Sequence, residues 1–297
     1  MTFYDNDTIV FIAGKLCVLL DLRTRNQRLI QIVEGYELTA LDQMRKPFSF
    51  SSKRKPTHLK FVAAQSYGPD WVLVVWLSGT KEIVAVFKPN AGKPRCPVHD
   101  MSFNASDREE LIVVGKNVFR LYEYQNESES ETGKFVEVVF EKHEEGEEYL
   151  SIAWPQKENL AVSNANGKIL FFRGIDLVRE ISVMDTLQDI LDSTPDSSAT
   201  DVSLQLRAVT CLTCTRTSYY ACLMDAQLLF MKAKKYSSIL LSKCTFLLNV
   251  VNKFPGEAVM SDDFLTQMEW NLNFTILSAT TADGQLIYLD FSKKMQM

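Results

Sequence analysis

Short apolar runs separated by polar turns fill most of this 297-residue chain. The clearest stretch predicts three strands, at 149–154, 159–162 and 168–172. An Asn166-Gly167 pair separates the last two, and Asn-Gly between apolar runs is a strong hairpin signal, because both residues accept the positive φ of a tight turn. The same order recurs from Trp270 to a turn at Asp283-Gly284. In both copies a Trp lies about thirteen residues ahead of the Gly, which indicates a repeat of propeller-blade type.

The strand pattern extends along the chain and predicts six sheet units. Their expected bounds are about 1–35, 46–88, 97–143, 148–184, 205–246 and 264–297. The second unit is expected to open with a strand at 48–50, because the preceding linker 34–46 has little to bury and reads as irregular. The last unit has only three clear strands. The fold prediction is therefore all-β: one WD40-like β-propeller domain over 1–297, with about six recognisable blades in an incomplete or divergent seven-bladed ring.

Three stretches depart from this pattern. Residues 125–131 form a polar, acidic loop, and 246–254 shows no clear period. Between 185 and 201, Leu187, Ile190 and Leu191 have helical spacing, and Asp185 or Thr186 could cap the start. We therefore expect one short amphipathic helix at about 186–192.

Composition and charge narrow the class of protein. The chain is 46% hydrophobic and 23% charged, which is typical of a globular protein with a sizeable core. Its net charge of −5 makes nucleic acid a poor default partner. The acidic N-terminus lacks the features of a signal peptide, and no apolar run approaches the roughly 20 residues that cross a bilayer. We expect a cytoplasmic protein.

Four groups of residues occur in order between about Asp7 and Arg173. They are 7–14, 68–71, 101–104 with 114–115, and 149–151 with 167–170. This series resembles the first, third, fourth and fifth blades of the cilia- and flagella-associated protein 57 family, WD-repeat proteins of motile cilia. No intact Trp-Asp dipeptide closes a blade, although Asp21 follows Leu20 where many WD repeats have that pair. The family's second blade has no counterpart between Ala40 and Phe48.

The resemblance implies a function as well as a fold. It implies a scaffold in the cytoskeleton of the cilium or flagellum, associated with inner dynein arms and their regulation. The implied partners are axonemal proteins: inner-arm dynein regulators, other WD-repeat or coiled-coil subunits, and tubulin. Nucleic acid and membrane insertion are not expected. The alternative is a cytosolic WD-repeat adaptor outside cilia, in trafficking or ubiquitin-ligase assembly.

Only one cysteine spacing suggests a metal site, at Cys211 and Cys214 with Cys222 nearby. A zinc site needs four converging ligands, and residues three apart on a strand face opposite sides of the sheet. Without a signal peptide, the six cysteines are expected to be reduced. We therefore predict buried thiols and no bound metal.

The remaining candidate residues favour structural roles. The three histidines, His58, His99 and His143, lie at strand ends and outside any catalytic motif. The acidic cluster of Glu141, Glu144, Glu145, Glu147 and Glu148 reads as a solvated loop, with a surface for a basic partner as the alternative. The basic groups Lys53-Arg54-Lys55 and Lys232, Lys234-Lys235 favour solubility, and Trp71, Trp76, Trp154 and Trp270 are expected in blade cores. We expect a non-enzymatic protein without catalytic, cofactor-binding or metal-binding residues, and without a cofactor.

Overall fold

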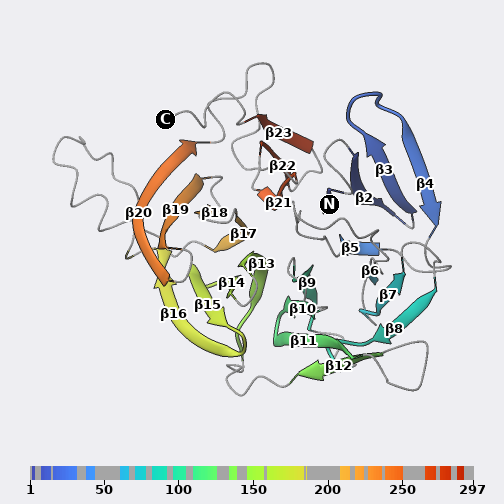
Figure 1. Cartoon of the computed structure of the whole chain (residues 1–297), viewed down its shortest axis with the longest axis horizontal. Coiled ribbons are helices and arrows are strands. Elements are labelled where there is room, and N and C mark those ends of the chain that lie inside the picture. The colour runs from blue at the N-terminus through green and yellow to red at the C-terminus, as the bar shows by residue number, and fades with distance from the viewer. Residues whose placement is uncertain are drawn as a thin grey trace, which may run out of the picture. The chain divides into compact units, whose positions relative to one another are not determined.

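The computed structural model describes the strands and most of their tight turns. The described residues are 2–3, 8–14, 16–31, 38–43, 61–66, 71–77, 82–91, 96–104, 110–125, 134–138, 146–156, 159–183, 185, 208–214, 218–223, 227–235, 238–249, 265–271, 275–281 and 286–290. They form six antiparallel sheets, five of four strands and one of three (Figure 1). The chain divides into two compact units, Met1–Gly146 and Glu147–Met297, with three sheets in each. The prediction of one domain over 1–297 stays a prediction.

Within each sheet of the first unit, each strand pairs with the next strand along the chain. The first sheet contains β1 (Thr2–Phe3), β2 (Thr8–Ala13), β3 (Leu16–Asp21) and β4 (Gln27–Gln31). The second contains β5 (Leu38–Gln43), β6 (Phe61–Ser66), β7 (Leu73–Leu77) and β8 (Ile83–Phe87). The third contains β9 (Val98–Phe103), β10 (Glu110–Gly115), β11 (Val118–Gln125) and β12 (Lys134–Val138).

The second unit repeats this plan. The fourth sheet contains β13 (Tyr149–Gln156), β14 (Asn159–Asn164), β15 (Lys168–Arg173) and β16 (Asp176–Ser182). The fifth contains β17 (Val209–Cys214), β18 (Ser218–Leu223), β19 (Gln227–Lys235) and β20 (Ser238–Asn249). The last contains β21 (Leu265–Trp270), β22 (Ile276–Thr281) and β23 (Leu286–Asp290), the three strands that the sequence predicts.

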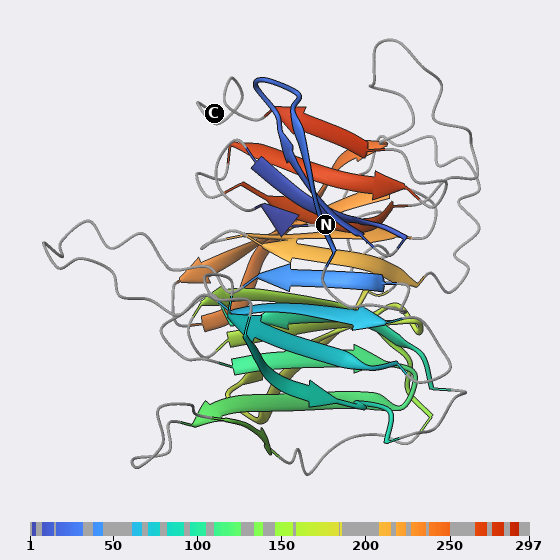
Figure 2. The ribbon, with the colours of Figure 1, turned by 90° about the vertical axis from the view of Figure 1, so that its right-hand side faces the viewer.

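The second sheet is covered on both faces, as its continuous apolar run on β7 indicates. Leu73 and Val75 join a buried cluster with residues of the third sheet, whereas Val74 and Trp76 pack with residues of the first. Successive strand residues point to opposite faces, so alternate positions of β7 supply two different cores. Phe61 on β6 is fully buried and packs edge-on against Phe135, with ring centroids 5.2 Å apart. Figure 2 shows the second and third sheets layered against each other.

In the second unit, the fourth and fifth sheets meet through their first strands. β17 lies beside β13, and the Leu212 backbone N–H donates to the Ser151 hydroxyl oxygen at 3.1 Å. Both residues are buried, so this bond satisfies a backbone donor where the two sheets meet. β17 also contacts β21 of the last sheet.

Gly115 marks a close approach of two backbones in the third sheet. It pairs with Val98 where the register of β10 against β9 shifts. A Cβ atom added at Gly115 would lie 2.1 Å from the Pro97 carbonyl oxygen and 2.8 Å from the Val98 Cα. Only glycine fits at this position without a shift of the backbone.

Most expected strands are confirmed, but the opening strand of the second sheet is not where the sequence predicts it. The linker 34–46 contains β5, which pairs with β6 along Leu41↔Ala64 and Asp42↔Ala63. A weakly apolar segment forms this strand because its ladder partner, β6, is strongly apolar, and tertiary pairing overrides local preference. The stretch 48–50 lies outside the described residues.

Two further expectations concern the ends of elements. β20 continues to Asn249, so residues 246–249 are strand where the sequence shows no period. The helix expected at 186–192 lies outside the described residues. Its expected cap at Asp185 or Thr186 needs correction, because the Ser182 hydroxyl oxygen accepts the Asp185 backbone N–H at 3.3 Å. That bond is the pattern of an N-cap three residues earlier in the chain.

Candidate interaction surface

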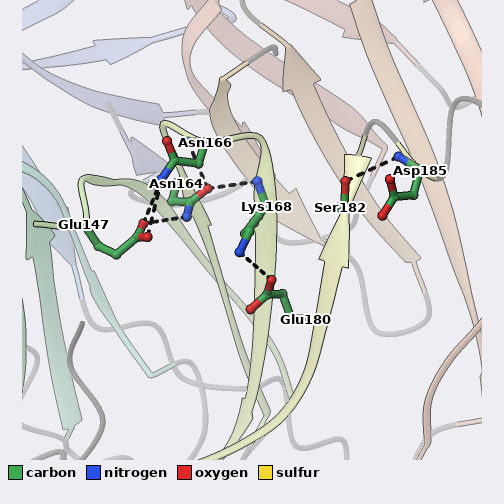
Figure 3. Close-up of polar contacts among 7 residues, drawn as sticks. All are labelled: Glu147, Asn164, Asn166, Lys168, Glu180, Ser182 and Asp185. Carbon is green, nitrogen blue, oxygen red and sulfur yellow. Dashed lines mark hydrogen bonds and ion pairs between the residues drawn. The ribbon is translucent and has the colours of Figure 1, made fainter. Parts of the chain in front are cut away.

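A group of polar side chains gathers at the end of the fourth sheet where β14 turns into β15. It comprises Glu147, Asn164, Asn166 and Lys168, and we call it the Glu147 cluster (Figure 3). Glu147 precedes β13, whereas the other three residues form the turn. In an antiparallel sheet the start of the first strand and the turn between the second and third lie at the same end, so the two segments meet.

Asn164 is the centre of the Glu147 cluster, and it is 1% exposed. Its Oδ1 accepts the backbone N–H groups of Asn166 at 3.1 Å and Lys168 at 2.8 Å. Its Nδ2 donates to Glu147 Oε2 at 2.8 Å. Asn166 Nδ2 donates to both Glu147 carboxylate oxygens at 3.3 Å. The asparagine side chain thus replaces backbone partners that a tight turn cannot provide.

The backbone of this turn differs in one detail from the prediction. The Gly167 N–H donates to the Asn164 carbonyl oxygen at 3.3 Å, so Ala165 and Asn166 are the central residues. The positive φ falls on Gly167, at 73°, which confirms the glycine requirement. Asn166 is not among the described residues with positive φ, so the two-residue Asn-Gly turn was wrong. A longer loop that ends on a left-handed glycine is a common hairpin form.

An ion pair extends from the Glu147 cluster across the neighbouring strands. Lys168 Nζ lies 2.7 Å from Glu180 Oε1, and the two side chains are 40% and 43% exposed. Such exposed pairs contribute little to stability, typically about 0.2–1 kcal/mol. The pair therefore adds less to the turn than the buried amide of Asn164 does.

The arrangement around Glu147 suits structure better than acid–base chemistry. Its carboxylate accepts hydrogen bonds from two side-chain amides, those of Asn164 and Asn166, which hold it against the turn. The Glu148 carbonyl oxygen also accepts the Ala165 N–H at 2.9 Å. These two glutamates belong to the acidic cluster of the sequence, and both hold the turn in place. Glu141, Glu144 and Glu145 lie outside the described residues, so a surface for a basic partner there stays a prediction.

The other charged turn lies between β3 and β4, and the sequence interpretation passed over its arginines. Arg23, Arg25 and Arg28 are exposed, and we call residues 21–29 the arginine hairpin. The hairpin could have been predicted from three closely spaced arginines at a turn that follows an apolar strand. The two basic groups that the sequence singles out are not placed: 53–55 lies outside the described residues, and the side chains at 232–235 are not described.

Asp21 organises the arginine hairpin, at the position that the sequence assigns to the WD-like aspartate. Its Oδ1 accepts the backbone N–H groups of Arg23 and Thr24, each at 2.9 Å. Its carbonyl oxygen accepts the Arg25 N–H at 2.8 Å. The bond from the Thr24 N–H, with help from Arg23, holds the pKa of the Asp21 carboxyl below its ordinary value. Arg25 has a φ of 58°, a strained conformation for a residue with a Cβ.

The cysteine pattern appears on neighbouring strands of the fifth sheet. Cys211 and Cys222 are paired in the register of β17 and β18, whereas Cys214 lies three residues further along β17. Cys211 is fully buried, and loss of water raises the pKa of the Cys214 thiol well above its ordinary value. In the part of the chain that the structure describes, no group of three or more metal-binding side chains comes together. The absence of bound zinc stays a prediction.

A further cysteine lies in the core of the first unit. Cys17 on β3 is 2% exposed and packs with Trp76 of the second sheet. Burial raises its pKa to about 12. Thiolates are the reactive form of cysteine, so this thiol acts as a small apolar side chain.

The structure places one of the three histidines and all four tryptophans, and the structural role expected of the histidines stays a prediction. His99 lies on β9 and is partly buried, whereas His58 and His143 lie outside the described residues. Among the tryptophans, Trp76 and Trp270 are buried core residues, and Trp71 and Trp154 are partly buried. Trp71 has a φ of 48°, so a bulky side chain occupies a conformation usually left to glycine.

Comparison with known proteins supports both the fold and the resemblance. No protein-family model matches the chain. The mouse (Mus musculus) protein named cilia- and flagella-associated protein 57 is 23% identical over 61% of this chain. The chain spans 17% of the length of that relative. The resemblance to this family, seen in the sequence, is therefore confirmed.

Solved structures decide the fold. The β-propeller domain of Cps50 (Swd1) from Myceliophteria thermophila is similar with a TM-score of 0.59 and 10% identity, over 98% of this chain and 85% of that one. The WD40 repeats of RRP9 are similar with a TM-score of 0.55 and 10% identity, over 94% of this chain and 70% of that one. This chain has a WD40-like β-propeller fold. A chain of the mitotic checkpoint complex is similar with a TM-score of 0.55 and 12% identity, over 98% of this chain and 73% of that one. At these identities the likeness shows the fold alone.

Among the described residues, no helix is both long and apolar enough to span a membrane.

Proposed function

We propose that this protein is a non-enzymatic WD-repeat scaffold of the motile cilium or flagellum axoneme. The observation that carries the proposal is the similarity to a ciliary WD-repeat protein, at 23% identity over 61% of the chain. If the similarity reflected only features that all propellers share, it would give no reason to place this protein in the cilium. The ordered series of blade-like motifs from 7–14 to 167–170 argues for common descent with this particular group.

The local geometry fits a scaffold. Glu147 and Asp21 use their carboxylates to hold turns, and Glu180 pairs with the basic side chain of Lys168. Catalysis requires a nucleophile, a base and an orienting group within hydrogen-bond reach of one another. The described part of the chain presents hydrogen-bonded turns and exposed strand edges, and these features suit protein–protein contact.

The proposed task is to hold axonemal proteins in place. The partners we propose are inner-arm dyneins and their regulators, other WD-repeat or coiled-coil subunits, and tubulin. Because each blade presents its own loops and outer strand, one propeller can contact several partners at once. The protein would then influence dynein activity by position, without a reaction of its own.

Proximity labelling in ciliated cells tests this function. The protein carries a biotin-ligase tag at its endogenous locus, and biotinylated proteins are identified by mass spectrometry. An untargeted ligase expressed in the same cells is the control. We expect enrichment of inner-arm dynein subunits and their regulators over this control. Enrichment of vesicle-coat or ubiquitin-ligase subunits, with no axonemal protein above control, would assign the chain to a non-ciliary adaptor and contradict the proposal.

A further inference from the structure

The arginine hairpin projects from the first sheet. Thr8, where β2 begins, pairs with Asp21, so residues 22–26 extend beyond the end of β2. Figures 1 and 2 show this turn as a blue loop at the end of the β3–β4 pair. Three arginines lie on the turn and the following strand, and all three are exposed. Their charge is therefore presented to the surroundings on a projecting element.

The outer strand of this hairpin has a regular edge. β4 pairs with β3 without a register shift, from Gln27↔Leu20 to Gln31↔Leu16. The outer strands β8, β16 and β20 are each paired with a register shift, whereas β12 of the third sheet is, like β4, paired without one. Bulges turn an edge away from additional strands, and β4 has none. Within the described residues, β4 pairs on one side only.

The two faces of β4 offer different chemistry. Arg28 pairs with Leu19 and Leu29 with Val18, so these neighbours point to opposite faces of the sheet. The Leu29 side chain is 61% exposed, the largest exposure among the described large hydrophobic residues. A strand laid along this edge would therefore meet a cation on one face and an apolar side chain on the other.

We propose that the outer edge of β4 binds an extended segment of a partner protein in which acidic and apolar residues alternate. The segment adds a fifth strand to the first sheet and exchanges backbone hydrogen bonds with β4. An acidic residue lies opposite Arg28, and the next residue packs on Leu29. Further acidic residues of the same segment meet Arg23 and Arg25 at the turn.

An acidic, extended protein segment fits this edge better than a nucleic acid or a second copy of this chain does. A nucleic acid has no ladder of peptide groups to match a strand edge, and the chain's net charge of −5 opposes its approach. A second copy paired through β4 would present only the residues Gln27–Gln31 to the edge, so no acidic residue of its strand could lie opposite Arg28. An acidic, extended protein segment satisfies both the edge and the charge.

Fluorescence anisotropy with the purified full chain tests the proposal, using a labelled peptide of alternating glutamate and valine. The triple variant Arg23→Gln/Arg25→Asn/Arg28→Gln removes the charges, and asparagine at position 25 tolerates positive φ. We expect its affinity to fall at least about tenfold, since three exposed charge pairs are lost. The matched variant Lys88→Gln/Lys116→Gln/Lys134→Gln removes the same charge from exposed positions in the same unit, and it should bind as the wild type does.

A second peptide separates strand addition from simple charge attraction. Backbone N-methylation at alternate residues keeps every glutamate but removes the N–H groups that would pair with β4, so its binding should be at least about tenfold weaker. Equal binding of this peptide, or of the triple arginine variant, would overturn the proposal. Tighter binding of polyuridylate, or a dimer of the chain that the triple substitution dissociates, would also overturn it. None of these results depends on where the protein acts in the cell.

Discussion

The Glu147 cluster and the arginine hairpin both place charged side chains at a tight turn, but they differ in where the partners of those charges come from. In the Glu147 cluster, the carboxylate is held by two asparagine amides of its own sheet. In the arginine hairpin, Asp21 is held by the backbone of the turn, and three arginines stay exposed. Glu147 stabilises the blade through the hydrogen bonds of its own sheet, whereas the exposed arginine side chains are also accessible to another molecule.

Asn164→Ala should produce the largest loss of stability, about 2–3 kcal/mol, because two backbone N–H groups and one carboxylate oxygen lose the buried amide that pairs with them. Chemical denaturation of the purified chain measures the change. Asn166→Ala is the matched control, since Asn166 is exposed and its amide reaches Glu147 at the longer distance of 3.3 Å. Equal losses for the two variants would show that Asn164 is not the centre of the cluster.

Gly167→Val should destabilise the fourth sheet by about 1–2 kcal/mol, because a β-branched residue is strained at a φ of 73°. Gly167→Asn should cost less, since asparagine is the side chain that best tolerates this region. The midpoint of thermal unfolding reports both changes. An unchanged midpoint for the valine variant would contradict the turn assigned to this position.

Asp21→Asn should destabilise the first sheet in a pH-dependent way. The pKa of Asp21 is lowered in the folded state, so its charge stabilises the fold above the ordinary aspartate value of about 3.9. That contribution disappears as the pH falls through the lowered pKa. Unfolding midpoints of wild type and variant should therefore differ at neutral pH and converge in acid. A difference that persists unchanged at the lowest pH would assign it to geometry and not to the charge.

The triple arginine variant should have the smallest effect on stability, within about 0.5 kcal/mol of the wild type, as is usual for exposed positions. The same denaturation experiment measures it. A loss above about 1 kcal/mol would mean that the arginine side chains contribute substantially to the stability of the fold, and the contrast between the two turns would fail.

The order and type of the strands could be predicted from the sequence because apolar runs and turn residues mark them locally. Gly167 is an example, since its positive φ follows from the hairpin pattern alone. β5 could not be found in this way, because its ladder partner β6 follows it by many residues and supplies the apolar character. Trp71 also has a positive φ that no local rule predicts. The sequence places Glu147 in a solvated acidic loop, because its asparagine partners come from a turn that lies further along the chain.

The central claim, that this WD40-like propeller works in the axoneme, is tested most directly by fractionating motile cilia. The endogenous protein carries a small tag, the ciliary membrane is removed with detergent, and the protein is measured in the soluble fraction and in the remaining axoneme. An axonemal scaffold should stay with the demembranated axoneme and leave it only when high salt extracts dynein arms and their associated subunits. Absence from isolated cilia, or complete release with the membrane and matrix, would contradict the claim.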